Sequence, residues 1–312
     1  MKTIFTLLLL FSFGIMPVLQ AQVVKKKPLT TSDFANWKVI SSPIVSSDGK
    51  YVSYEINPQK GDGNLVVKPV DSKKEDLLPR GYGASFSSES DFIVYKIKQP
   101  ADSIRNAKKK KLKKEQMPKD SIGIFVFRHH KSFKYPNLKQ YSLPKENASW
   151  VAFLTDMKKA KKKAEKDDDS KKKGDLKAKK ASGTDDQKSQ LVLFNSETGD
   201  TVCFQNISEY FYAQQGNSIT FIRQTKDSLD RAEVLVFDTK THQAKVIFNR
   251  PGTAKKITSD PQGGRFGFVF SPDTAKVKTY SLYYGSINSG EARAVVLPAM
   301  MGLPVGWSPS EF

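Results

Sequence analysis

Cysteine and histidine are almost absent from this chain of 312 residues. A single cysteine, Cys203, cannot form an intramolecular disulfide, which excludes a disulfide-stabilised scaffold and a cysteine-rich zinc module. Of the three histidines, His129 and His130 are adjacent, so on a strand their side chains point to opposite faces and cannot bind one ion together. The sequence therefore predicts neither a metal site nor a bound cofactor.

Long apolar runs are also absent, except at the N-terminus. A short positive start precedes an apolar run over residues 4–19 and a small-residue cleavage site, which is typical of a secretory signal peptide over 1–21. The alternative is an uncleaved anchor, although Gly14 and Pro17 would weaken a membrane helix. We expect a mature chain from Gln22 that is periplasmic or secreted, with no transmembrane segment after cleavage and no nucleic acid as partner.

Acidic residues are in deficit, because 51 Lys+Arg stand against 32 Asp+Glu and give a formal net charge of +19. Two tracts hold most of this excess. Residues 101–119 carry 8 Lys/Arg against 2 acidic residues, and residues 157–188 carry 13 Lys against 7, so each tract has a net charge of +6. Few apolar residues offset the entropy of ordering them, which predicts two disordered Lys-rich insertions. The alternative is that they contact an anionic surface.

A repeat runs through the rest of the chain. Short alternating strands recur around five apolar positions that are 41, 58, 68 and 47 residues apart, namely Val52, Ile93, Val151, Ile219 and Phe266. Without the two Lys-rich tracts the middle intervals shorten to 39 and 36 residues. A period of about 40 residues with four strands per unit is typical of β-propeller blades. We therefore predict an all-β, incomplete β-propeller over 22–312, although a β-sandwich also has alternating strands.

Each repeat continues with a second apolar strand, and Asp62-Gly63 predicts a hairpin turn before the first of these, because Gly accepts a positive φ. The further strands are expected at 64–67, 123–127, 190–194, 233–237 and 281–284. Cys203 is expected in a strand as a small apolar residue. The pattern predicts about five four-stranded blades, with residues 302–312 as the start of a sixth.

No catalytic residue can be assigned. The nearest match to the serine-hydrolase motif G-x-S-x-G is Gly306-Trp307-Ser308-Pro309-Ser310. Its final Gly is replaced, and Pro309 has no backbone N–H with which to stabilise an oxyanion. All three histidines precede Ser308, whereas this motif requires one after it. We predict that the chain alone is inactive.

Several segments resemble the opening of exported prolyl oligopeptidase-type (S9) serine peptidases. They are Lys27-Pro28-Leu29-Thr30, Trp37-Lys38, Ser46-x-Asp48-Gly49-Lys50-Tyr51-Val52, Ile56-Asn57-Pro58-Gln59-x-Gly61-Asp62-Gly63-Asn64-Leu65-Val66, Pro79-Arg80-Gly81-Tyr82, Met117-Pro118-Lys119-Asp120-Ser121-Ile122-Gly123-Ile124, Ser208-Glu209-Tyr210-Phe211 and Gly306-Trp307-Ser308-x-Ser310-Glu311-Phe312. Together they cover nearly the whole chain, and the run over 57–65 is the most specific of them.

The resemblance implies a propeller that precedes a C-terminal α/β-hydrolase domain and limits access to its active site to short peptides. It therefore implies that this chain is truncated before that domain, which would be its partner, with a peptide as substrate. No position matches a catalytic residue of the family, so none is carried over. The alternative is a freestanding exported propeller, similar to TolB-like propellers, that binds a peptide, a polysaccharide or an envelope partner.

Overall fold

The computed structural model describes residues 28–35, 37–157, 189–226, 230–298, 300–304 and 307–309. The chain divides into two compact units, Met1–Trp37 and Lys38–Phe312. The described part of the first unit contains one short helix, α2 (Thr31–Phe34), where the Asp33 carboxylate accepts the backbone N–H of Thr30 at 2.8 Å. The predicted signal peptide lies outside the described residues.

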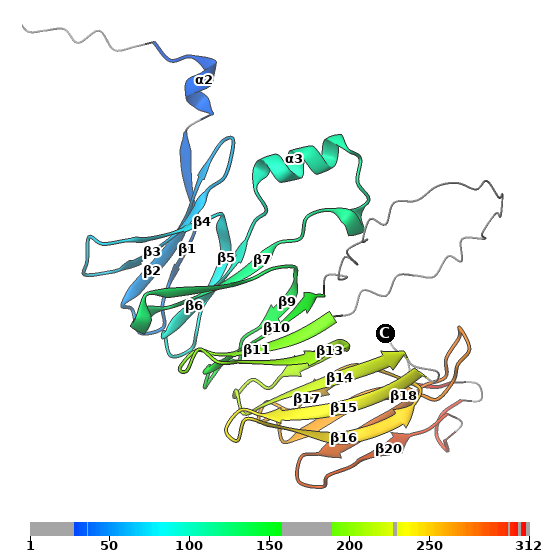
Figure 1. Ribbon diagram of the computed structural model, residues 1–312. Coiled ribbons are helices and arrows are strands. Elements are labelled where there is room, and N and C mark those ends of the chain that lie inside the picture. The colour runs from blue at the N-terminus through cyan, green and yellow to red at the C-terminus, as the bar shows by residue number, and fades with distance from the viewer. Residues whose placement is uncertain are drawn as a thin grey trace, which may run out of the picture. The chain divides into compact units, whose positions relative to one another are not determined.

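The second unit contains twenty described strands, which form five four-stranded antiparallel sheets that follow one another along the chain (Figure 1). Each sheet consists of four consecutive strands, and we call these sheets blades 1 to 5. Blade 1 contains β1 (Lys38–Val45), β2 (Tyr51–Pro58), β3 (Asn64–Pro69) and β4 (Asp76–Pro79); blade 2 contains β5 (Gly81–Phe86), β6 (Phe92–Ile97), β7 (Ser121–Val126) and β8 (Lys131–Tyr135); blade 3 contains β9 (Leu138–Ser142), β10 (Trp150–Asp156), β11 (Ser189–Asn195) and β12 (Thr201–Gln205); blade 4 contains β13 (Ile207–Tyr212), β14 (Ser218–Lys226), β15 (Asp230–Asp238) and β16 (Gln243–Pro251); blade 5 contains β17 (Thr253–Ser259), β18 (Arg265–Ser271), β19 (Ser281–Ser286) and β20 (Ala292–Val296).

The turn before the second strand of a blade shows why the repeat is visible in the sequence. The Asp48 carboxylate accepts hydrogen bonds from the Ser46 hydroxyl at 2.7 Å and from the Lys50 backbone N–H at 3.0 Å. These two bonds lower the pKa of Asp48 to about 2. At the same place in blade 2, the Ser87 hydroxyl accepts the backbone N–H of Asp91 at 2.9 Å. A side-chain oxygen, of Asp48 in the first turn and of Ser87 in the second, thus accepts a backbone N–H in both turns.

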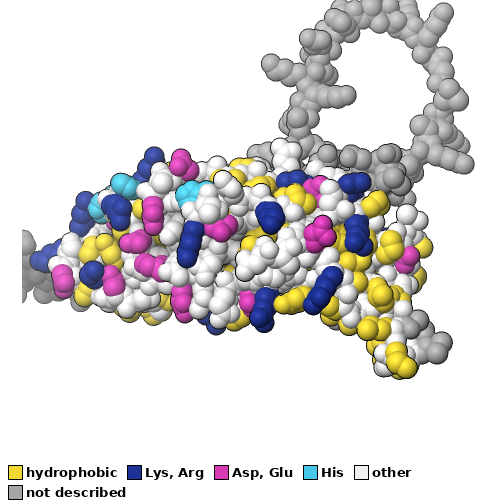
Figure 2. All heavy atoms as spheres, turned by 90° about the horizontal axis from the view of Figure 1, so that it is seen from below, with side chains coloured by type: hydrophobic (Ala, Val, Ile, Leu, Met, Phe, Trp, Pro, Cys, Tyr) yellow, Lys and Arg dark blue, Asp and Glu magenta, His cyan; other side chains and the backbone are white. Residues whose placement is uncertain are grey.

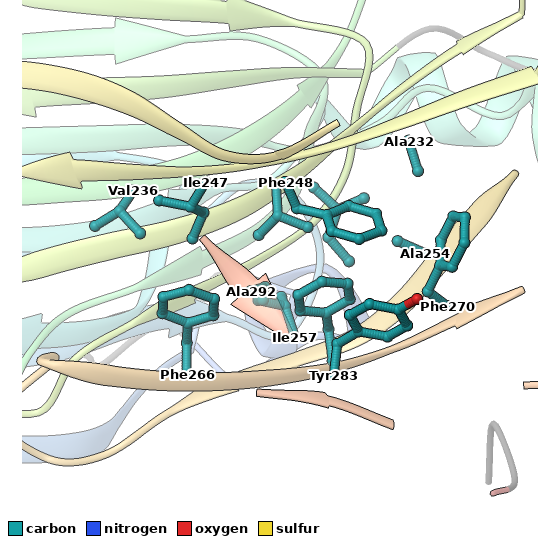
Figure 3. Packing of buried hydrophobic residues seen from close by; sticks show 13 residues of the cluster. Ala232, Val236, Ile247, Phe248, Ala254, Ile257, Phe266, Phe270, Tyr283 and Ala292 are labelled. Atoms are coloured by element: carbon teal, nitrogen blue, oxygen red, sulfur yellow. The ribbon is translucent and has the colours of Figure 1, made fainter. Parts of the chain in front are cut away.

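Successive blades pack face to face through shared hydrophobic cores. Four clusters of buried residues join blade 1 to 2, 2 to 3, 3 to 4 and 4 to 5. Figure 3 shows the last of them, in which Phe248 and Ile247 of β16 face Phe266 and Phe270 of β18 and Tyr283 of β19. Stacking of four-stranded antiparallel sheets in chain order is the blade arrangement of a β-propeller. The all-β propeller prediction is therefore confirmed.

The five repeat positions all fall in the second strand of a blade. They are Val52 in β2, Ile93 in β6, Val151 in β10, Ile219 in β14 and Phe266 in β18. The expected further strands coincide with β3, β7, β11, β15 and β19, so five blades are present as predicted. The expected start of a sixth blade is only partly described, and its described residues after β20 contain no strand.

The first Lys-rich tract, residues 101–119, is not disordered, so this part of the prediction was wrong. It joins β6 to β7 and forms helix α3 (Ala101–Lys109) and a short 3-10 helix (Lys114–Gln116). Alanine, arginine and lysine favour helix, and Ala107 is buried, so the helix has one anchored side. The Asp62 carboxylate also accepts the Ala101 backbone N–H at 3.0 Å. Of the second tract, 157–188, all but Met157 lies outside the described residues.

The outer face of blade 1, which points away from blade 2, carries exposed apolar side chains in β1 and β4. Ile40 and Val45 are each 64% exposed, and Leu77 is 55% exposed. In the paired strands these side chains lie opposite Ile56, Val52 and Val66. Leu65 and Val67 point to the other face of the sheet, where they belong to the core shared with blade 2. Blade 1 therefore presents on this side the kind of surface that the inner blades bury.

Charged side chains of both signs are interspersed over the face of the molecule that Figure 2 shows. This agrees with a sequence in which most of the excess positive charge is confined to two tracts. An even mixture of signs produces no extended field of one sign over that face.

Two glycines of the third strands are required by aromatic rings of the second strands. A Cβ at Gly123 would lie 2.3 Å from the Tyr95 ring, and one at Gly285 would lie 2.2 Å from the Phe266 ring. We expect Gly123→Ala and Gly285→Ala each to lower the free energy of unfolding by about 1–2 kcal/mol, because buried rings must shift. The matched control is Gly267→Ala in β18, whose Cβ would meet nothing closer than 3.5 Å. Urea denaturation in which all three variants behave alike would contradict this account.

Candidate functional site

The connections between the second and third strands of blades 1 and 2 meet at one end of the blades, which we call the insertion end. Helix α3 lies between β6 and β7, and residues 157–188 lie between β10 and β11. A pocket of about 330 Å³ opens at this end between blades 1 and 2. Its polar lining comes from the β2–β3 hairpin, the β4–β5 junction and both ends of the α3 insertion, and consists of Asn57, Asp62, Arg80, Lys98, Gln99 and Asp120.

Arg80 is fixed in this pocket by its backbone and its side chain. Its N–H donates to the Gly63 carbonyl at 2.8 Å, and its carbonyl accepts the Lys98 N–H at 3.0 Å. The guanidinium Nη1 also donates to the Lys98 carbonyl at 2.8 Å. The backbone of Arg80 has φ of 61°, a left-handed conformation that costs a non-glycine residue of order 1 kcal/mol or more and persists only where the surroundings impose it.

The β2–β3 hairpin shapes the wall of the pocket beside Asn57. The predicted turn is present, but the positive φ of 113° belongs to Gly61 rather than to Gly63. Gly63 is required for another reason, since a Cβ there would lie 2.1 Å from the Asn57 side-chain oxygen. The Asn57 amide donates to the Glu55 carboxylate at 3.1 Å, which orients the amide.

The two carboxylates of the pocket have hydrogen-bond partners within the protein. Asp62 accepts the Ala101 N–H at 3.0 Å, and Asp120 accepts the Gln99 N–H at 3.3 Å and the Tyr82 hydroxyl at 2.6 Å. Burial of Tyr82 raises the pKa of its phenol, and the bond to Asp120 raises it further. The Lys98 ammonium lies 4.9 Å from the centre of the Tyr82 ring, within the range of a cation–π interaction.

A second group of charges joins the bases of the two insertions. Asp156, the last residue of β10, is buried, with a side chain that is 7% exposed. Its carboxylate forms ion pairs with Lys119, at the end of the α3 insertion, and with Lys139 at 3.1 Å. Lys139 also donates to the Ser189 hydroxyl at 2.7 Å, at the start of β11. The network therefore holds both insertions at their exits from the sheets.

The first strands of the blades form a continuous row. The Tyr141 hydroxyl of β9 donates to the Gly83 carbonyl of β5 at 3.4 Å, and the Glu209 carboxylate of β13 accepts the Lys256 N–H of β17 at 2.7 Å. A hollow of about 370 Å³ lies along this row between β9 and β13, lined by Tyr141 and Phe211 among others. Each first strand is also an edge strand of its described sheet, so it has backbone groups that no neighbouring strand pairs.

The residues singled out in the sequence lie apart from these hollows. We expected His129 and His130 on a strand, and this prediction was wrong. His129 is the last residue of a 3-10 helix (Phe127–His129), and His130 follows it in a left-handed conformation. His130 lies 3.8 Å from the Asp76 carboxylate. Cys203 lies in β12 as predicted but is exposed. Among the described residues there is no cluster of ligands that could hold a metal ion.

Within the part of the chain that the structure describes, no helix has both the length and the apolarity that a membrane span requires.

The sequence predicted no pocket, although it contained a signal for one. Three separate segments that resemble S9 peptidases meet at the same pocket. The first contributes Asn57 and Asp62, the second Arg80 and the third Asp120. Lys98 and Gln99 lie in none of these segments. They reach the pocket because β6 ends beside the β4–β5 junction.

No family model matches this chain, and no curated protein matches it. Among solved structures it is similar to the β-propeller domain of the Trilobed protease from Pyrococcus furiosus, with a TM-score of 0.40 and 9% identity over 86% of this chain and 74% of that chain. It is similar to Pyrococcus horikoshii acylaminoacyl peptidase, with a TM-score of 0.38 and 12% identity over 84% of this chain and 40% of that chain. It is also similar to an oligogalacturonate lyase, with a TM-score of 0.41 and 14% identity over 86% of this chain and 68% of that chain. The chain thus spans less than two thirds of the acylaminoacyl peptidase.

Proposed function

We propose that this chain is the non-catalytic propeller of an S9-type serine peptidase. In this proposal it acts beside an α/β-hydrolase domain and limits which peptides reach that domain. It works as an exported protein in the periplasm or outside the cell. In this proposal the chain controls which peptides enter and binds them, and the hydrolase domain cleaves the peptide bond.

The observation that carries the proposal is the row of first strands. Five edge strands follow one another, and contacts such as that between Tyr141 and Gly83 join them. A passage bounded by rigid sheet edges admits an extended peptide more readily than a folded domain. The unpaired backbone groups and the hollow beside Phe211 supply hydrogen bonds and apolar contact for such a peptide.

The sequence supports the proposal independently. The segments that resemble S9 peptidases run through blades 1, 2 and 4, and three of them line one pocket at the insertion end. Packing of the blades does not require these segments to meet at one pocket, because the hydrophobic cores already hold the sheets together.

The test begins with the genomic reading frame that contains codon 312. We expect it to encode a G-x-S-x-G motif and a later histidine, with or without a frameshift. The full-length enzyme should then cleave a chromogenic tetrapeptide and spare intact casein, and deletion of the propeller should raise cleavage of casein relative to the tetrapeptide. A frame without hydrolase sequence, or an enzyme that cleaves casein as readily as the tetrapeptide, would overturn the proposal.

A second candidate function is that of a freestanding propeller that binds a peptide, a polysaccharide or an envelope partner. The pocket around Arg80 and Lys98 favours this second candidate, because such a pocket can bind a ligand without a hydrolase domain. This candidate predicts a true stop codon after codon 312 and a stable five-bladed protein in solution.

A further inference from the structure

We propose that the pocket between blades 1 and 2 binds the C-terminal carboxylate of a peptide through Arg80 and Lys98. The choice of a peptide as ligand rests on the proposed function. The assignment of a carboxylate site rests on the charges, hydrogen bonds and size of the pocket itself.

The two cations of the pocket have no carboxylate partner within the described residues, although Asp62 and Asp120 line the same pocket. Arg80 uses Nη1 on the Lys98 carbonyl, and its other N–H donors are available to a ligand. Lys98 is exposed, and its ammonium lies over the Tyr82 ring. A planar guanidinium with free donors is well suited to a carboxylate, which accepts two parallel hydrogen bonds from arginine, and Lys98 adds a second positive charge to the lining of the same pocket.

The two carboxylates of the pocket keep their negative charge, but within the described residues neither forms an ion pair with Arg80 or Lys98. Asp62 accepts a backbone N–H of helix α3, and both oxygens of Asp120 accept hydrogen bonds from Gln99 and Tyr82. Each carboxylate is therefore held in the wall of the pocket by its own donors. Their remaining lone pairs can accept the amide N–H of a bound peptide, and the Asn57 side-chain oxygen offers a neutral acceptor nearby. A peptide terminus carries both of the groups that this lining complements, a carboxylate and an adjacent N–H.

The size of the pocket limits the ligand to a chain end. Its volume of about 330 Å³ lies at the lower limit of ordinary small-molecule pockets, which run from about 300 to 1,000 Å³. The terminal residue or two of a peptide fit that volume, and the rest of the chain continues into solvent at the insertion end.

The backbone conformation of Arg80 allows a substitution that removes its charge without straining the chain. Asparagine tolerates the left-handed conformation that φ of 61° requires, so Arg80→Asn removes the guanidinium and leaves the β4–β5 junction intact. Lys98→Gln removes the second charge from an exposed position. Arg293→Gln, on exposed β20 of blade 5, removes one positive charge far from the pocket in the sequence and serves as the matched control.

The experiment measures binding of N-acetyl-dialanine with a free carboxylate, and of its C-terminal amide, to the whole 312-residue chain by isothermal titration calorimetry. We expect the acid to bind at least roughly tenfold more tightly than the amide, because a charge-assisted hydrogen bond is worth about 1.5–3 kcal/mol. Arg80→Asn and Lys98→Gln should each remove most of that preference, and Arg293→Gln should keep it.

Several outcomes would overturn the proposal. These are equal binding of acid and amide, no saturable binding of either at millimolar concentration, or a preference that survives in Arg80→Asn. Inorganic phosphate that binds the pocket while the peptide acid does not would also overturn it. Because this assay uses no hydrolase domain, its failure leaves the peptidase proposal standing, and failure of the cleavage assay leaves this binding result intact.

Discussion

Truncation of Phe153 to alanine is expected to lower the free energy of unfolding by about 3–5 kcal/mol. Phe153 lies in β10, is 0% exposed and belongs to the core shared by blades 2 and 3. Its ring lies 4.9 Å from that of Tyr135 in β8, so its loss opens a cavity between two blades rather than within one. Rigid sheets on both sides can close such a cavity only in part, which is why the cost exceeds the lost transfer free energy.

The measurement is urea denaturation followed by tryptophan fluorescence, with Val277→Ala as the control. Val277 is 85% exposed, so its truncation should change the free energy of unfolding by less than about 0.5 kcal/mol. If Phe153→Ala cost no more than Val277→Ala, blades 2 and 3 would not depend on this core. The description of the molecule as stacked blades with shared cores would then be wrong.

Asp156→Ala is expected to lower the free energy of unfolding by about 2–3 kcal/mol. The substitution leaves the ammonium groups of Lys119 and Lys139 beside one another without their shared counter-charge. The expected cost is below that of a fully buried pair, because the two lysine side chains are 30% and 39% exposed. Since the network holds both insertions, limited proteolysis should also cut the variant faster at the bases of the insertions.

The control for this prediction is the exposed ion pair between Asp102 and Arg105 in α3, whose side chains are 82% and 52% exposed. Asp102→Ala should cost less than about 0.5 kcal/mol, because surface pairs contribute little. Replacement of Lys119 and Lys139 by methionine in the Asp156→Ala background should recover part of the loss, because it removes the uncompensated charges. A double replacement that worsens stability would show that packing, not charge, explains the effect.

The strands and turns of the blades could be predicted from the sequence, because they depend on residues that are close together along the chain. The short apolar run around Ile93 and the alternation of apolar and polar residues around Ile219 each predict a strand with buried apolar side chains, whatever the details of packing. The turn before β2 depends on Ser46, Asp48 and Lys50, which are adjacent along the chain. For this reason the blade count and the second and third strands were predicted to within a few residues.

Features that depend on contacts between distant segments were missed. The α3 insertion has the composition of a disordered tract, yet the carboxylate of Asp62, which is 39 residues away, accepts its first N–H, and Ala107 is buried. The ion pairs of Asp156 likewise join residues that are 37 and 17 positions apart. No local pattern encodes such partners, since they are chosen by the way two sheets meet.

Short antiparallel sheets repeated about every 40 residues can be predicted from the order of residues alone, because strand periodicity and turn chemistry are local properties. That Arg80, Lys98 and Asn57 share a pocket, and that a lysine-rich insertion is helical, becomes visible only in the folded protein. The pocket forms where two blades meet, and the free energy of their packing depends on side chains from both.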